Sequence, residues 1–167
     1  MTIRRGSLLV KTYREGVAAK AGHDLVLEVT RWDATLDGEA VELTADARSL
    51  EVREGVRGVK PLTDRDRDEI RKNIDEKVLR GQPIAFRGRA VESAGRLAVE
   101  GELTMAGSTR ALTAELAAED GRVAGTITLR QSDWGIKPYR GLMGALKVRD
   151  DVEVVVEAYR IPEERTD

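Results

Sequence analysis

The feature that most constrains the fold of this chain is a row of four alternating segments between residues 84 and 130. Within each segment apolar and polar residues alternate, which is the pattern of a β-strand with one face toward a core and one toward water. The pairs Ala94-Gly95 and Asp120-Gly121 and the triplet Ala106-Gly107-Ser108 separate the segments. Residues of this kind favour tight hairpins. The row therefore predicts an antiparallel β-meander.

Further alternating segments lie on both sides of the meander. Strands are predicted over residues 7–14, 24–32, 39–48 and 147–159, and together with the meander they make eight. Pairing of the last strand with the first would remove the free edges of the sheet. The sequence thus predicts a mainly β protein, with residues 1–167 forming a single domain built as an eight-stranded antiparallel barrel.

Between the third and fourth predicted strands the apolar spacing becomes helical. An apolar stripe with a spacing of four residues consists of Ile70, Ile74 and Val78. Thr63 is a suitable N-cap and Gly81 a suitable end. One helix is therefore predicted here, packed by its narrow apolar face either across the side of the barrel or over one end. Residues 51–61 are interpreted as a flexible connection that leads into the helix.

The inward positions of the predicted strands carry unusually small residues. They include Gly88, Ala90, Gly101, Ala114, Ala118 and Gly125, and the whole chain has one Phe. A barrel of about eight strands is either filled by its side chains or holds one small ligand. The small residues favour an apolar cavity, and a Phe at position 101 or 114 is expected to block it. The alternative is that neighbouring Leu and Ile side chains, or the helix, fill the space.

Composition excludes several classes of function. The chain has 28 basic and 30 acidic residues, a net charge of −2, which disfavours non-specific nucleic-acid binding. It has no cysteine, so disulfides and thiolate metal sites are not expected. No apolar run approaches the roughly 18 residues of a membrane span, and residues 1–10 lack the apolar core of a signal peptide. A cytoplasmic protein that does not span a membrane is expected.

Catalytic and metal-binding patterns find little support. Asp64, Asp66 and Asp68 imitate the opening of a calcium loop, but Glu69 stands where such a loop needs glycine. There is no Gly-x-Ser-x-Gly elbow, Walker loop or His-Glu-x-x-His motif. His23 is the only histidine, and we interpret it as a structural residue, with a polar contact to a ligand near the barrel rim as the alternative. Neither a catalytic set nor a metal or cofactor is predicted.

The segment 132–147 is long for a hairpin connection and is a candidate mouth or lid. Its large apolar residues are Trp134, Ile136, Tyr139, Leu142, Met143 and Leu146. If the segment is a lid, Lys137 and Arg140 could contact a phosphate or carbonyl head group. The alternative is a bent strand pair packed on the helix.

Three stretches of the chain resemble the YceI-like family of lipocalin-shaped proteins. They are Gly22-His23-Asp24-Leu25, residues 101–109 (GELTMAGST) and residues 131–136 (QSDWGI), in which Trp134 stands where many members have Phe. The resemblance covers roughly residues 6–159 and implies a lipocalin-like barrel that holds a long isoprenoid chain, often in a homodimer. It implies that the ligand contacts inward apolar residues, namely Leu27, Leu43, Phe86, Leu103, Leu116, Ile127, Leu129, Trp134 and Val154.

Three functions follow for comparison with the structure. The favoured one is a carrier or sequestering protein for an isoprenoid lipid, either a polyprenyl compound or an isoprenoid quinone. A second is an enzyme that acts on such a lipid, but the inward positions supply almost no titratable groups for catalysis. A third is an interaction or stress-related protein whose barrel is filled. Fold alone does not separate these functions.

Overall fold

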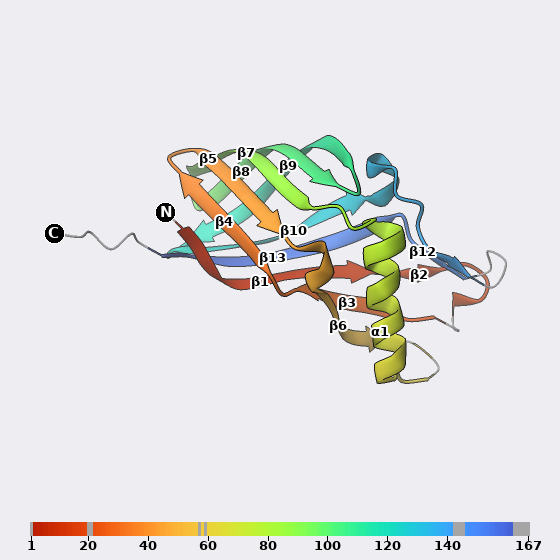
Figure 1. The fold of residues 1–167 in the computed structure, drawn as a ribbon. Coiled ribbons are helices and arrows are strands. Elements are labelled where there is room, and N and C mark those ends of the chain that lie inside the picture. Colours follow the sequence, from red (N-terminus) through yellow and green to blue (C-terminus); the bar gives the residue numbers. More distant parts are fainter. Residues whose placement is uncertain (1, 20–21, 57, 59, 142–145, 162–167) are drawn as a thin grey trace.

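The structure, a computed structural model, describes residues 2–19, 22–56, 58, 60–141 and 146–161. An antiparallel sheet of ten strands curls into a half-barrel, and one α-helix lies at the end away from the two termini (Figure 1). The strands of this sheet are β1 (Thr2–Thr12), β3 (Asp24–Val29), β4 (Trp32–Asp37), β5 (Ala40–Ala45), β6 (Leu50–Val56), β7 (Ile84–Ser93), β8 (Arg96–Met105), β9 (Ser108–Glu119), β10 (Arg122–Arg130) and β13 (Asp151–Ile161).

Shorter elements complete the fold. A separate three-stranded sheet contains β2 (Arg14–Glu15), β11 (Arg140–Gly141) and β12 (Leu146–Val148). The helical elements used below are η2 (Ala47–Ser49), α1 (Asp64–Asn73), the π-helical turn η3 (Ile74–Val78) and η4 (Gln131–Trp134). No helix in the part of the chain that the structure describes is long and apolar enough to cross a membrane.

The predicted meander is confirmed as β7 to β10. Each of its three hairpins turns on two residues with positive φ, for example 51° at Asp120 and 75° at Gly121. Two successive left-handed residues are typical of the type I′ turn, whose twist matches that of the flanking strands. The short-range turn signals in the sequence were therefore sufficient to place this part of the sheet.

The ten strands form two five-stranded halves that are joined mainly at one end. The first half is β6-β3-β1-β13-β10 and the second is β4-β5-β7-β8-β9. As predicted, the last strand pairs with the first, here β13 with β1. Between the halves, β1 pairs with β4 only near Thr2 and Ile3, and β9 pairs with β10 only over residues 117–119. We call the end at which β1 begins and β13 ends the joined end, and the opposite one, which α1 covers, the α1 end (Figure 1).

The predicted count of eight strands is wrong because the N-terminal half holds two strands more than expected. The predicted strand 24–32 overlaps two strands, β3 and β4, and residues 51–61, interpreted as a connection, contain most of β6. Leu50 and Val52 of β6 are buried and alternate with polar residues, but the strand is short and contains Gly55 near its end. Consequently the helix follows the fifth strand of the large sheet, not the third.

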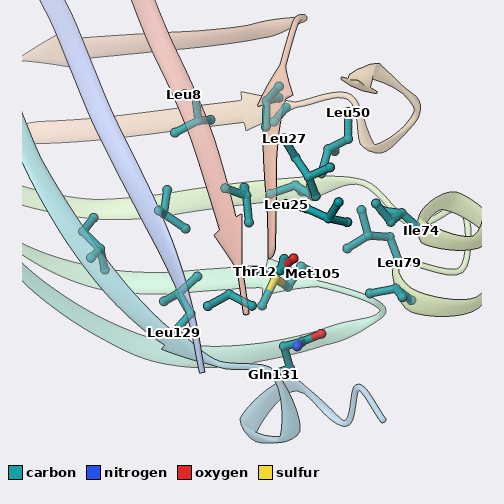
Figure 2. Close-up of a pocket in the computed structure, with 18 of the residues that line it drawn as sticks. Leu8, Thr12, Leu25, Leu27, Leu50, Ile74, Leu79, Met105, Leu129 and Gln131 are labelled. Atoms are coloured by element: carbon teal, nitrogen blue, oxygen red, sulfur yellow. The ribbon is translucent and has the colours of Figure 1, made fainter. Parts of the chain in front are cut away.

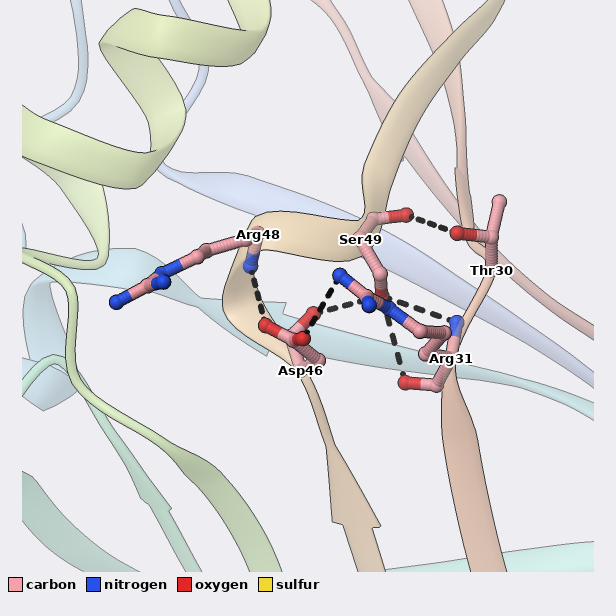
Figure 3. A network of polar contacts seen from close by, with 5 residues as sticks. All are labelled: Thr30, Arg31, Asp46, Arg48 and Ser49. Carbon is pink, nitrogen blue, oxygen red and sulfur yellow. Dashed lines mark hydrogen bonds and ion pairs between the residues drawn. The ribbon is translucent and has the colours of Figure 1, made fainter.

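A polar corner lies where the chain passes from β3 to β4 and from β5 to β6, between the two half-sheets (Figure 3). Ser49 is buried there: its hydroxyl donates to the Asp46 carbonyl at 2.7 Å and accepts from the Arg31 backbone N–H at 3.0 Å. The Thr30 hydroxyl donates to the Ser49 carbonyl at 2.9 Å, and the Asp46 carboxylate receives Arg31 at 3.0 Å and the Arg48 N–H at 2.9 Å. These bonds satisfy backbone groups that leave the sheet ladder at the bend.

The helix α1 lies over the α1 end of the sheet, which decides between the two placements left open by the sequence. Thr63 caps it as predicted, in a capping box with Asp66. The Arg67 guanidinium donates to the Val52 carbonyl of β6 at 2.8 Å. Ile70, Ile74 and Val78 pack against the main hydrophobic core. The helix is thus held by its cap, by β6 and by its apolar stripe.

The capping box makes the stability of α1 sensitive to acid. The Thr63 backbone N–H donates to the Asp66 carboxylate at 2.9 Å, and this bond lowers the pKa of Asp66. A lowered pKa adds stability above the ordinary Asp value of about 3.9, and that stability is lost as the pH falls through the lowered value. Asp66→Asn should therefore lower the melting temperature at neutral pH, with a smaller difference in acid. Asp68→Asn, which lies outside the capping box, is the control. If Asp66→Asn differed from the wild type by the same melting temperature at neutral and at acid pH, the prediction would be contradicted.

Charged residues of the outer face pair across neighbouring strands. Examples are Arg87 with Glu42 at 3.3 Å, Arg89 with Glu39 at 2.5 Å, Arg96 with Glu115 at 2.5 Å and Arg122 with Glu157 at 3.0 Å. Such exposed pairs add little stability individually. They do explain how a chain that is 35% charged presents alternating signs on these strands.

Candidate binding cavity

A cavity of about 970 Å³ lies between the two half-sheets and extends from the α1 end to the joined end. Figure 2 shows side chains from three sources that point into it. Leu8 and Leu27 come from one half-sheet, Met105 from the other, and Ile74 and Leu79 from the helical segment. This volume is at the upper end of the range of about 300–1,000 Å³ for small-molecule pockets.

Most of the predicted contact residues lie on the wall of this cavity. Those that line it are Leu27, Leu43, Phe86, Leu103, Leu116, Ile127, Leu129 and Val154. They come from seven different strands, and strand alternation alone placed them on the inner face. Their position on the wall is a finding, whereas their contact with a ligand stays a prediction.

Trp134 lies behind the wall. Its side chain is 3% exposed, and its indole N–H donates to the Leu103 carbonyl at 2.8 Å. Trp134 is absent from the residues that line the cavity, whereas Trp32 at the start of β4 is among them. The tryptophan inside the stretch that resembles the family thus ties η4 to β8, and the other tryptophan faces the cavity.

We expect Trp134→Phe to cost at least about 1 kcal/mol of stability, because the Leu103 carbonyl loses its indole donor. Affinity for an apolar ligand of the cavity should change by less than about twofold, since position 134 does not line the cavity. The variant keeps Trp32 as its only tryptophan. Fluorescence of that residue then measures binding, and urea unfolding measures stability. A large loss of affinity with unchanged stability would place Trp134 in the ligand site.

The small inward residues have two different roles. Ala90 and Ala114 line the cavity as expected. Gly88 and Gly101 instead face each other across β7 and β8, and a Cβ at Gly101 would lie 2.1 Å from the Arg87 carbonyl oxygen and 2.6 Å from the Gly88 Cα. These glycines allow the backbones of β7 and β8 to approach each other closely. Phe at position 101 would distort the sheet, so only Ala114→Phe remains a sound test of the cavity.

Part of the cavity wall was not predicted from the sequence. It includes Leu8 and Val10 of β1, Leu50 of β6, and the apolar stripe Ile70, Ile74 and Val78 of the helical segment. The signal for the helical part was present, because an amphipathic stripe must face an apolar surface. The contribution of β6 was missed because that strand was interpreted as a connection.

Polar side chains line the cavity chiefly at the α1 end. They are Thr12, Arg14, His23, Lys60, Asp66, Glu69, Asn73, Lys77, Gln131 and Lys147. His23 Nε2 lies 2.5 Å from the Lys60 carbonyl oxygen, which ties β3 to the segment before α1. A Cβ at Gly58 would lie 2.0 Å from the same His23 nitrogen. His23 therefore makes a contact within the protein and also lines the cavity, while its polar contact to a ligand stays a prediction.

The candidate head-group residues Lys137 and Arg140 are exposed and do not line the cavity. Lys147 of β12 lines it instead, together with Tyr139. Arg140 in β11 pairs with Lys147, which in turn pairs with Glu15 of β2. Leu142 and Met143 of the predicted lid lie outside the described residues. Within the described part of this segment, β11 and β12 thus belong to a small sheet beside the α1 end.

The wall offers binding chemistry more than catalytic chemistry. In the residues that the structure places, no three His, Asp or Glu side chains are grouped so as to hold a metal ion. The charged side chains of the wall lie mainly at the α1 end, and the interior between the two ends is lined by aliphatic and aromatic residues. Such a wall stabilises an apolar ligand by removing its surface from water.

Comparisons with known proteins agree with this fold. The family model of the YceI-like domain matches residues 13–159. The crystal structure of Burkholderia cenocepacia BcnA superposes with a TM-score of 0.62 at 13% sequence identity, covering 92% of this chain and 96% of that chain. At this identity the likeness concerns the fold alone. No curated protein matches the chain.

Proposed function

Because the chain belongs to the YceI-like family of lipocalin-like polyisoprenoid-binding proteins, we propose that it binds an isoprenoid lipid inside its cavity, as a carrier or sequestering protein. The observation that supports the proposal most strongly is the apolar cavity of about 970 Å³ between the half-sheets. A polyprenyl compound and an isoprenoid quinone share the tail chemistry that this wall suits.

The energetics of such a ligand are favourable. A prenyl unit has five carbons, so its burial contributes about 4 kcal/mol at roughly 0.8 kcal/mol per carbon. Four units would nominally contribute about 16 kcal/mol, close to the practical ceiling on affinity. Immobilising the tail and the side chains of the α1 end offsets much of this. The length of tail that the protein accepts is therefore set by the dimensions of the cavity more than by the affinity gained with each prenyl unit.

The other two functions have less support. A filled barrel is disfavoured by the volume of the cavity. An enzyme would need acid and base groups that converge on one reacting atom. The titratable residues of the wall lie mainly at the α1 end, whereas the interior that would hold the tail is lined by aliphatic and aromatic residues. A role as an interaction protein would rest on the outer face, where the charges described above pair with one another.

Organic extraction of the freshly purified protein, followed by mass spectrometry, tests the proposal. We expect a stoichiometric isoprenoid lipid in the wild type and its loss in Ala114→Phe purified in parallel. Intact mass under non-denaturing conditions tests the expected homodimer in the same sample. An empty wild-type protein that also fails to bind added prenyl alcohols and quinones would contradict the proposal and favour the interaction role.

A further inference from the structure

The inward side chains of two strands change from apolar to charged at the joined end of the cavity. Along β13 the inward positions are Val152, Val154, Val156, Ala158 and then Arg160. Along β7 the last inward position is Glu92, after Phe86, Gly88 and Ala90. A cation and an anion therefore occupy the last inward positions of strands from opposite half-sheets.

These two residues form an ion pair across the end of the cavity. The Arg160 guanidinium donates from Nη1 to Glu92 Oε2 at 2.6 Å. The backbone N–H of Arg160 donates to the Gly121 carbonyl at 2.9 Å. The Arg160 side chain is 18% exposed and that of Glu92 is 47% exposed. Arg160 lines the cavity whereas Glu92 does not. Arg160 is thus the inner member of the pair and Glu92 holds it from outside.

Stability alone does not account for arginine at this inward position. Its Nε and Nη2 atoms are buried, and no described residue accepts a hydrogen bond from them. Buried N–H groups without partners cost free energy, and each such group in a folded protein calls for an explanation. An apolar side chain here would avoid that cost, which indicates that the arginine has a role other than stability.

We propose that Arg160, held by Glu92, is the end wall of the cavity and sets the longest isoprenoid tail that the protein accepts. This inference rests on the proposed function. The polar side chains of the α1 end suit a head group, so the tail extends toward the joined end and meets Arg160. From Val152 to Arg160 the strand rises about 26 Å at roughly 3.3 Å per residue. A longer tail would have to separate Arg160 from Glu92.

A series of prenyl alcohols tests the end wall. Farnesol, geranylgeraniol and solanesol have three, four and nine units, and quenching of tryptophan fluorescence measures their affinity. In the wild type we expect geranylgeraniol to bind more tightly than farnesol, and solanesol to bind no better than geranylgeraniol. Arg160→Ala should bind solanesol at least about tenfold more tightly than the wild type does, with farnesol unchanged, because further carbons become buried.

Two more variants keep the test decisive. Val156→Phe narrows the cavity two residues before Ala158. It should lower the affinity for geranylgeraniol by at least about tenfold and leave the affinity for farnesol unchanged. Arg122→Ala removes an arginine from an ion pair on the outer face and should change the affinity for neither alcohol. The end wall would be overturned, but not the proposed function, if affinity depended on tail length in the same way in the wild type and all variants. An equal gain of solanesol affinity in Arg122→Ala and Arg160→Ala would overturn it as well. A wild type that binds none of the alcohols would overturn both.

Discussion

Ala114→Phe is expected to lower the affinity for a prenyl lipid by about a thousandfold while leaving the protein folded. Ala114 lies in β9 with its side chain on the cavity wall. The added ring takes the space of at least one prenyl unit, whose burial contributes about 4 kcal/mol at roughly 0.8 kcal/mol per carbon, and each 1.4 kcal/mol is about tenfold in affinity. Because the ring enters empty space, the free energy of unfolding should change little.

The neighbouring position supplies a matched control. Thr113 is exposed on the outer face of the same strand, so Thr113→Phe adds a similar side chain without entering the cavity. Geranylgeraniol affinity can be measured for both variants by tryptophan fluorescence, with circular dichroism to verify the fold. Equal affinity in Ala114→Phe, Thr113→Phe and the wild type would place the ligand outside this cavity.

Gly101→Ala should destabilise the protein by about 3 kcal/mol or more, in the range of the most disruptive single substitutions. The new Cβ would lie 2.1 Å from the Arg87 carbonyl oxygen and 2.6 Å from the Gly88 Cα. Both atoms belong to the backbone of β7, so relief requires the two strands to separate. Urea unfolding monitored by circular dichroism gives the midpoint and slope from which this free energy is obtained.

Gly125→Ala is the control for the loss of a strand glycine. A Cβ at this position would meet the Leu116 side chain, with Cδ2 at 2.6 Å, and a leucine rotamer can adjust. We expect its cost to be clearly smaller than that of Gly101→Ala. Similar midpoints for the two variants would show that the close approach of β7 and β8 is not what requires glycine at position 101.

Local signals predicted the parts of the fold that depend on neighbours in the sequence. The meander followed from alternation and from turn pairs such as Asp120-Gly121, and the helix from Thr63 and its apolar stripe. The corner at Thr30 and Ser49 could not be predicted in this way. It depends on bonds between residues 18 and 19 positions apart, such as those between Arg31 and Ser49 and between Thr30 and Ser49. Without the corner, β3 and β4 appear as one strand and β6 as a connection.

The candidate site was predictable to the extent that strand alternation decides which face a residue occupies. Alternation placed Phe86, Leu103 and Val154 on the inner face, and they line the cavity. It placed Gly101 there too, but it could not reveal how close β7 lies. Trp134 belongs to η4 rather than to a strand, so its direction depends on the distant Leu103 carbonyl. Errors therefore arose where the outcome depends on separation between strands or on irregular backbone.

The limited pairing between β9 and β10 has a consequence for how fast the protein can load. Within the described residues these strands pair only over residues 117–119 and 122–124, so for most of their length no ladder of backbone hydrogen bonds joins them. The α1 end is covered by side chains and by one helix. Access to the interior therefore requires only local motions that break no strand pairing. Opening of the cavity is then expected on the microsecond to millisecond timescale of helix and loop movements, not on that of unfolding.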